Sequence, residues 1–189
     1  MQQRTYRTQS IFSAPYSANG ESFVYSAAQA GTSPRIYVVS SAYAEPRAIS
    51  DSGIHLLAVS SKDELAVLVK AKYEHHRVVT GTLARMPLGD GTPRELETGV
   101  READWSPGAT QLAIVRVVGG VDKREFPIGT ELYQTSGYLS DIRVAPDGRN
   151  IAFAEHPEKG DDRGFVATVE VGGKHTVLTP PISAIGGLA

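Results

Sequence analysis

The sequence predicts an all-β protein, a β-propeller of about four blades that each hold four antiparallel strands. Three observations support this prediction: one hairpin pattern recurs four times along the 189 residues, its apolar residues are spaced by two, and two further strand-like segments follow each copy. Helical repeats of similar length would need apolar residues at spacings of three and four. We therefore expect a single propeller domain with blades at about 11–50, 54–98, 101–137 and 138–180.

The repeated hairpin carries turn-forming residues at the same place in every copy. The four copies read SAPYSANGESFVYSA (13–27), LLAVSSKDELAVLVK (56–70), EADWSPGATQLAIVR (102–116) and SDIRVAPDGRNIAFA (140–154). Their turn-opening residues, Ser17, Ser60, Ser106 and Ala145, are 43, 46 and 39 positions apart, close to the length of a propeller blade. We expect the turns themselves at Asn19-Gly20, Lys62-Asp63, Gly108-Ala109 and Asp147-Gly148.

Two further strand candidates complete each blade. They are RIYVVSS and PRAIS in the first blade, GTLARMPL and PRELE in the second, KREFPIG and TELYQTSG in the third, and FVATVEV and HTVLT in the fourth. Continuous apolar runs such as LAVLV suit the second strand, which is buried on both faces between neighbouring blades. The more polar fourth strand suits the rim that faces solvent.

Composition excludes several classes of function. The 19 basic and 21 acidic residues are scattered and give a net charge of −2, so we do not expect nucleic acid as a partner. No apolar stretch approaches the roughly 18 residues of a membrane span, and the start MQQRTYRTQS lacks the apolar core of a signal peptide. The absence of cysteine excludes disulfides and thiolate metal sites but leaves the compartment open.

Two of the repeats resemble a known family. The segments DWSPGATQLAIVR and IRVAPDGRNIAFAEHPEKGDDRG are similar to the WD40-like repeats of TolB-like bacterial β-propellers, and more narrowly to the propeller sensor regions of bacterial serine/threonine kinases. The resemblance covers nearly the whole chain and implies binding and protein contact rather than chemistry, in a family that is often extracytoplasmic. It departs from the family at Ser61-Lys62-Asp63 and Pro107-Gly108-Ala109, where the usual Ser-Pro-Asp-Gly turn is replaced. No kinase motif is present, and no catalytic residue carries over.

Both ends of the chain look like parts of further blades. RTYR precedes the first hairpin as an outer strand would, and AIGGLA ends the chain as the beginning of another inner strand would. We therefore expect a partial propeller, a segment of a longer one, either open or completed by oligomerisation. Open blade edges and apolar blade faces promote self-association, so a homodimer or a higher oligomer is expected.

One face of a propeller collects the loops that lead into the first strand of each blade and those that join the second strand to the third. The first group holds His55, Glu102, Asp104 and Asp141, and the second holds His75, His76, Asp122, His156, Asp161 and Asp162. Imidazoles and carboxylates can hold zinc or manganese, and such a metal can activate water for ester or phosphoester hydrolysis.

Within this set, the starts of the inner strands come closest to the propeller axis. We therefore predict His55, Asp104 and Asp141 as metal ligands. His75, His76, His156, Asp161 and Asp162 are further ligand-face candidates, whereas Asp63 and Asp147 belong to the opposite face.

A plainer interpretation is available for each of these segments. YEHHR (73–77) reads as a solvated hairpin tip, and HPEKGDDRG (156–164) as a loop whose aspartates bind backbone N–H groups. The sequence has no nucleophile elbow, phosphate-binding glycine loop, HExxH pair or EF-hand. Two functions remain: a recognition module for a protein, peptide or small ligand, and a metal-dependent hydrolase of esters or phosphotriesters whose site a homodimer completes.

Overall fold

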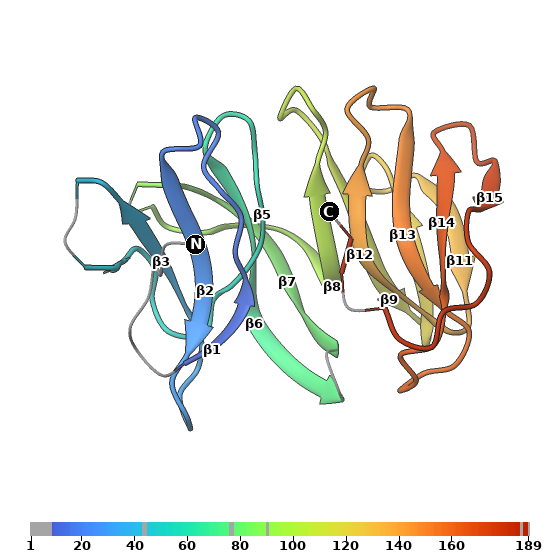
Figure 1. The fold of residues 1–189 in the computed structure, drawn as a ribbon, viewed down its shortest axis with the longest axis horizontal. Helices are drawn as coiled ribbons and strands as arrows, with labels where there is room; N and C mark the ends of the chain where they lie inside the picture. Colours follow the sequence, from blue (N-terminus) through green and yellow to red (C-terminus); the bar gives the residue numbers. More distant parts are fainter. Residues whose placement is uncertain (1–8, 43–44, 76–77, 90, 186, 189) are drawn as a thin grey trace. The chain divides into compact units, whose positions relative to one another are not determined.

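The computed structural model describes residues 9–42, 45–75, 78–89, 91–185 and 187–188 (Figure 1). Over these residues the chain is all β, as the sequence predicted, and it contains no helix that could span a membrane. The strands are β1 (Ser10–Ser13), β2 (Ser22–Ala28), β3 (Arg35–Ser40), β4 (Arg47–Ala48), β5 (His55–Val59), β6 (Glu64–His75), β7 (Val78–Pro87), β8 (Arg94–Trp105), β9 (Leu112–Val118), β10 (Val121–Glu125), β11 (Glu131–Thr135), β12 (Tyr138–Val144), β13 (Asn150–His156), β14 (Phe165–Glu170) and β15 (His175–Val177).

The chain forms two compact units. Unit 1 holds residues 1–71 and 82–97, and unit 2 holds residues 72–81 and 98–189. Strands β1–β4 form a four-stranded sheet in unit 1, and β12–β15 form another in unit 2. The remaining strands follow the order β11-β10-β9-β8-β7-β6-β5 in one seven-stranded sheet, where separate blades were expected. They are joined because β8 continues through Gly99, whose φ of 69° lets a strand bend without ending.

The four predicted hairpin turns are confirmed. In each turn the backbone N–H of the fourth residue donates to the carbonyl of the turn-opening residue; the pairs are Gly20 to Ser17, Asp63 to Ser60, Ala109 to Ser106 and Gly148 to Ala145. The fourth residue has a positive φ in all four, between 54° and 72°. A positive φ at this position closes a short antiparallel hairpin. It recurs in all four copies because each copy has turn-forming residues at this place.

A side-chain oxygen fixes each turn from within. The hydroxyl oxygens of Ser17, Ser60 and Ser106 accept backbone N–H groups from residues at the start of the following strand or just before it. Ala145 has no hydroxyl, and there the carboxylate of Asp147 accepts the N–H groups of Arg149 and Asn150 instead. The four turns are therefore equivalent in backbone but use two kinds of side chain.

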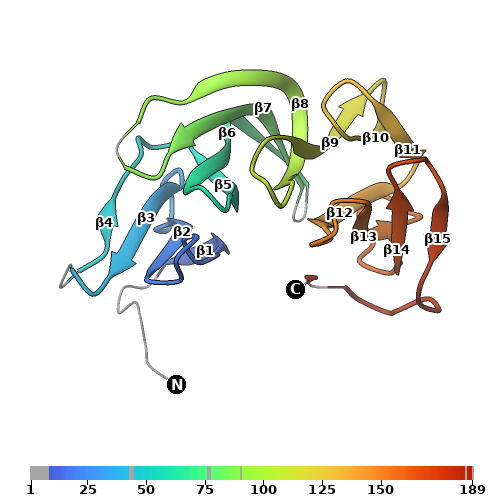
Figure 2. The same ribbon diagram turned by 90° about the horizontal axis from the view of Figure 1, so that it is seen from above.

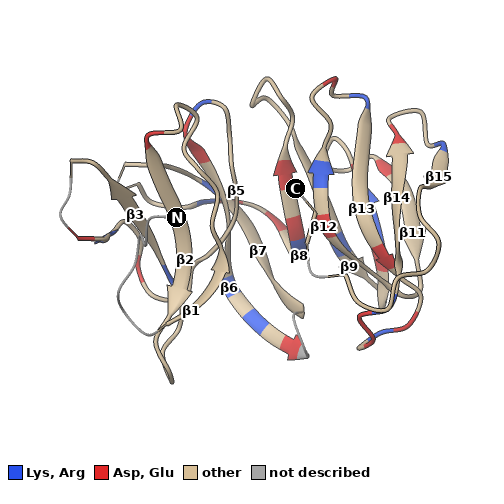
Figure 3. Cartoon of the chain, viewed as in Figure 1, with Lys and Arg blue, Asp and Glu red and all other residues tan. Residues whose placement is uncertain are grey.

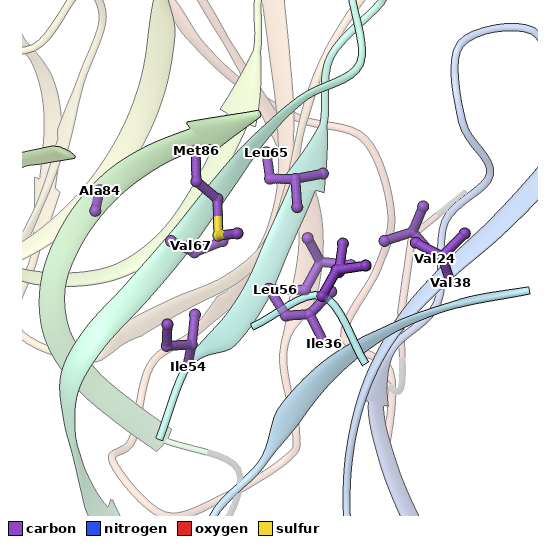
Figure 4. Close-up of a cluster of buried hydrophobic side chains, with 10 residues drawn as sticks. Val24, Ile36, Val38, Ile54, Leu56, Leu65, Val67, Ala84 and Met86 are labelled. Atoms are coloured by element: carbon purple, nitrogen blue, oxygen red, sulfur yellow. The ribbon is translucent and has the colours of Figure 1, made fainter. Parts of the chain in front are cut away.

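Blade packing follows the same pattern in both units. In unit 1, Val24 of β2 shares a core with Leu65 and Val67 of β6 (Figure 4). In unit 2, Ala113 and Val115 of β9 share a core with Ile151 and Phe153 of β13, and the sheet β12–β15 lies beside β9–β11 (Figure 2).

The hairpin turns give a common register to these second strands. Leu65 and Val67 correspond to Ile151 and Phe153, and Val24 corresponds to Ala113. We call the face that carries Leu65 and Val67, or Ile151 and Phe153, the receiving face of a blade. The opposite face, with Val24 or with Ala113 and Val115, is the covering face. In each unit, the covering face of one blade packs on the receiving face of the next.

Candidate functional site

Several of the predicted ligand-face residues meet at one end of the last blade, in unit 2. Strand β12 begins there with Tyr138, β13 ends there with His156, and residues 157–164 connect β13 to β14. The pairing of Tyr138 with His156 and of Ser140 with Ala154 brings the start of β12 against the end of β13. Strand polarity therefore gathers these side chains as the sequence predicted.

A β-bulge shapes this end of β12. The register shifts between Ser140 and Arg143, and Asp141 within the bulge has a φ of 55°. Aspartate tolerates this left-handed conformation better than most residues do. The hydroxyl of Ser140 donates to Oδ2 of Asp141 at 2.8 Å.

His156 is the centre of the cluster. Its side chain is 1% exposed, and its ring lies parallel to that of Tyr138, with the centroids 4.1 Å apart. Nε2 lies 3.0 Å from the hydroxyl oxygen of Ser140, and Nδ1 lies 3.2 Å from the backbone carbonyl oxygen of Arg163. The imidazole thus ties β12 to the β13–β14 loop.

The proton positions limit what this cluster can do. A carbonyl oxygen only accepts, so Nδ1 must carry a proton to bond Arg163. The Ser140 hydroxyl has one proton, which can go to Oδ2 of Asp141 or to Nε2 of His156, because both atoms lie within hydrogen-bond distance. In either case both ring nitrogens of His156 face partners inside the cluster, and the side chain is 1% exposed.

The loop itself is fixed by the neighbouring groups. The hydroxyl of Tyr138 donates to the carbonyl oxygen of Asp161 at 2.9 Å, and it lies 3.4 Å from Oδ1 of Asp162. Asp161 accepts the backbone N–H and the Nε–H of Arg163, and these hydrogen bonds lower the pKa of the Asp161 carboxyl. The aspartates therefore bind N–H and O–H groups within the loop, as the plainer interpretation of the sequence expected.

Two glycines allow the chain to approach His156 closely. A Cβ on Gly137 would lie 1.9 Å from the carbonyl oxygen of His156. A Cβ on Gly164 would lie 2.3 Å from the carbonyl oxygen of Glu155 and 3.1 Å from Nδ1 of His156. Neither position has room for a side chain.

A buried ion pair lies next to the ring of Tyr138. Arg101 pairs with Oδ2 of Asp122, and that oxygen also accepts the N–H of Leu139 at 2.9 Å. The Arg101 guanidinium carbon lies 5.5 Å from the centroid of the Tyr138 ring. Burial raises the pKa of the Asp122 carboxyl, and Arg101 opposes that shift. This pair places Asp122 with the cluster, as predicted.

The other predicted residues lie elsewhere. Asp104 is the second-last residue of β8, so the structure corrects its placement at the start of an inner strand. Asp104 precedes the turn-opening Ser106 by two residues, so it lies beside that turn, and it accepts the N–H of Val144 at 2.8 Å. Burial raises the pKa of the Asp104 carboxyl.

The three histidines of the second blade lie apart from this cluster in the sequence. His55 opens β5 in unit 1, where its ring meets that of Phe12 edge to face at 5.3 Å, and burial lowers its pKa. His75 is the last residue of β6, and His76 lies outside the described residues. Within the described part of the chain, no three His, Asp or Glu side chains form a group that could hold a metal ion. Zinc or manganese binding by His55, Asp104 and Asp141 therefore stays a prediction.

Sequence reasoning missed Arg124 of β10. This side chain is 0% exposed, and none of its three guanidinium nitrogens has a hydrogen-bond partner among the described residues. Its guanidinium carbon lies 4.3 Å from the centroid of the Phe153 ring, between the covering face of β9–β11 and the receiving face of the last blade. Burial lowers the pKa of Arg124 to about 9. Side chains alternate between the two faces of a strand, and the pairing of β10 with β9 places Arg124 opposite Val115. Only this pattern could have indicated that Arg124 is buried.

Comparison with known proteins supports the fold. No family model and no curated protein matches the chain. The crystal structure of TolB from Acinetobacter baumannii is similar, with a TM-score of 0.69 and 17% identity, over 91% of this chain and 44% of that one. The structure of a putative TolB from Agrobacterium tumefaciens has a TM-score of 0.69 and 13% identity, over 86% of this chain and 62% of that one.

These similarities confirm the predicted TolB-like β-propeller fold. The chain spans 44% and 62% of the lengths of the two structures, as a partial propeller would. At such low identity the similarity establishes the fold alone.

Proposed function

We propose that this TolB-like propeller chain is a recognition module without catalytic activity, a segment of a sensor-type propeller. Its binding end is the end of unit 2 formed by the start of β12 and the loop 157–164. A protein, a peptide or a small polar molecule is the expected ligand, and self-association of the chain is part of the proposal. The proposal rests on one observation: the side chains of this end that could take part in catalysis form contacts that hold the loop 157–164 in place.

His156 shows this most clearly. Both of its ring nitrogens have partners, its faces are covered, and it is 1% exposed. Such a residue cannot reach a substrate, but it can hold a loop in one conformation. A pre-organised loop loses less entropy when it binds, which favours recognition.

The outer surface of the loop offers the groups that a ligand can reach. Glu158 and Arg163 have side chains that are 75% and 66% exposed. Lys159 donates to the carbonyl oxygen of Gly120 in the β9–β10 turn, which joins two loops of this end. The loop thus presents charges of both signs on a fixed backbone (Figure 3). Mixed charges of this kind suit a polar or zwitterionic partner better than a polyanion.

The test begins with selection of binders. A phage-displayed peptide library is panned on the whole chain, and the affinities of the selected peptides are then measured by calorimetry. We expect Glu158→Ala and Arg163→Ala to weaken binding by tenfold or more, because their side chains face solvent at the loop. Lys62→Ala, an exposed residue of a hairpin turn in unit 1, is the control and should leave the affinity unchanged. If no selected peptide responds to the loop variants, the proposed binding end is wrong.

A hydrolase is the competing function, and a second assay separates the two. Ester and phosphotriester turnover is measured with added zinc or manganese and again with chelator. We expect no turnover above background in any condition. Chelator-sensitive turnover that His55→Ala, Asp104→Ala or Asp141→Ala abolishes would replace recognition by metal-dependent hydrolysis.

A further inference from the structure

We propose that a small monatomic anion such as chloride binds Arg124 inside unit 2, between strands β9–β11 and the last blade. This site is separate from the proposed binding end, because the Arg124 side chain is 0% exposed whereas Glu158 and Arg163 of that end face solvent. Three features support it: a guanidinium without a bonded partner, carboxylates that bind other groups, and surroundings that are apolar and closed.

Arg124 differs from the charged residues beside it in β10. Those residues all form ion pairs, which are Asp122–Arg101, Lys123–Glu131 and Glu125–Arg116. Among the described residues, by contrast, no group accepts a hydrogen bond from any of the three guanidinium nitrogens of Arg124. A buried cation without a counter-charge is strongly destabilising, so we infer that Arg124 has a partner that the chain does not supply.

The carboxylates that could act as this partner bind other groups. Asp104 attracts Arg124 electrostatically, but no hydrogen bond joins the two, and Oδ2 of Asp104 accepts a backbone N–H of β12. Burial also raises the pKa of the Asp104 carboxyl, which disfavours its charged form. Glu155 of β13 accepts the hydroxyl of Tyr133 through Oε1, and its Oε2 lies 3.3 Å from Nε2 of His175. The charge of Arg124 is therefore balanced only in part.

The immediate neighbours of Arg124 are apolar or aromatic. Within the sheet, Arg124 pairs with Val115 of β9 and with Tyr133 of β11. Across the interface, its guanidinium carbon lies 4.3 Å from the centroid of the Phe153 ring. The ring attracts the cation through one face, but the N–H groups lie in the plane of the guanidinium and need acceptors there. An anion in that plane supplies both an acceptor and the missing charge.

The closed surroundings limit the size of the anion. Arg124, Val115 and Phe153 are all 0% exposed, so sulfate or phosphate cannot reach the guanidinium unless the two sheets separate. A halide ion is small, and because it is spherical it accepts N–H groups from any direction. It can enter during local opening of the interface. Water would also accept the N–H groups, but it would leave the buried charge unbalanced, which favours an anion.

Bromide replaces chloride in crystals and is located by its anomalous scattering. The whole chain is crystallised in sodium bromide, and diffraction data are collected at the bromine absorption edge. We expect an anomalous peak within hydrogen-bond reach of the guanidinium nitrogens of Arg124, and no such peak in crystals of Arg124→Met. Bromide only at exposed lysine or arginine side chains, an adventitious ion only, would overturn the proposal. A water molecule on Arg124 in place of bromide would also overturn it.

Thermal unfolding in solution provides a second measurement. Melting temperatures are compared in sodium chloride and in sodium gluconate at equal concentrations, because an anion that binds only the folded state raises the melting temperature as its concentration increases. We expect chloride to raise the melting temperature of the wild type by about 3 °C or more relative to gluconate. Arg124→Met should lose this response.

The choice of variants separates anion binding from general effects of salt. Arg124→Met replaces the buried cation by an apolar side chain of similar length, a change that folded proteins often tolerate. Lys123→Met is the matched control, since it removes the neighbouring cation of β10, which pairs with Glu131, and leaves Arg124 in place. Lys123→Met should keep the full chloride response. Equal chloride responses in the wild type and in Arg124→Met would contradict the proposal.

Discussion

The imidazole ring of His156 lies flat on the phenol ring of Tyr138, with 4° between the ring planes and 4.1 Å between the centroids. This contact joins the end of β13 to the start of β12, and the two ring nitrogens extend it to Ser140 and to Arg163. The pair anchors the loop that the proposed function requires to be rigid.

Removal of this anchor should release the loop. We expect His156→Ala to lower the free energy of unfolding by about 2–4 kcal/mol, because it empties a buried site and leaves Ser140 and the Arg163 carbonyl without this partner. His175→Ala is the matched control, since His175 also stacks on a tyrosine, Tyr133, but is 26% exposed. Its cost should be about 1 kcal/mol or less. Hydrogen exchange of residues 157–164 should accelerate only in His156→Ala, and equal protection in both variants would contradict the anchoring role.

The glycine beside Nδ1 of His156 should not tolerate a methyl group. We expect Gly164→Ala to destabilise the protein by about 3 kcal/mol or more, because its Cβ would meet the Glu155 carbonyl and force a backbone shift. Gly172→Ala is the control, since no atom lies within 4 Å of its Cβ and its φ is not in the left-handed region. Denaturant unfolding compares the two. Similar midpoints would show that the chain can separate from His156 at little cost.

Two equivalent hairpin turns carry an alanine in one and a glycine in the other at the position with a positive φ, so the two residue types can be exchanged. Ala109 adopts a φ of 54° in the turn opened by Ser106, where Gly148 has a φ of 68° in the equivalent turn. A residue with a Cβ is strained in this conformation by about 1 kcal/mol. Ala109→Gly should therefore raise the melting temperature, and Gly148→Ala should lower it. Changes of the same sign in both variants would show that contacts of the methyl group, and not the backbone, decide stability here.

The pKa values of the buried aspartates and of Asp161 should be shifted in opposite directions from the ordinary aspartate value. Burial raises the pKa of Asp104 and Asp122, and hydrogen bonds to Arg163 lower that of Asp161. A raised folded pKa means that the contribution to stability is full below the ordinary value of about 3.8 and is lost as the pH rises through the folded pKa. A lowered folded pKa gives the reverse, so the contribution of Asp161 is present above about 3.8 and is lost as the pH falls.

Carboxyl carbon NMR shifts, recorded against pH, test this assignment. Asp104 and Asp122 should titrate above the range of exposed aspartates, and Asp161 below it. A titration of Asp122 below that range would show that Arg101 outweighs burial.

The sequence predicted correctly those features that depend on residues adjacent to one another along the chain. The turn-opening Ser17 and Ser60 were identified because a hairpin turn is determined by the few residues that form it. The sequence also predicted that His156 and Asp162 lie at the same end of the last blade, because strand polarity alone decides the end at which a loop lies.

Features that depend on long-range pairing were not predictable. The continuous seven-stranded sheet was not expected because β8 passes through Gly99 as one strand, and nothing local shows whether a glycine ends a strand or bends it. The contact of Ser140 with His156 depends on a bulge in β12 that shifts the register across two strands. The burial of Arg124 depends on which blade covers it, and a charged residue gives no local sign of that.

Sedimentation equilibrium of the whole chain tests the central claim most directly. The account predicts a mass of twice 20.2 kDa for the wild type and for Tyr73→Asp, in which an exposed tyrosine of β6 is changed. Tyr16→Asp places a charge on an exposed aromatic side chain beside Phe23 in the first blade and should shift the mass toward that of a single chain. A wild type that sediments at 20.2 kDa over the whole concentration range would contradict the account.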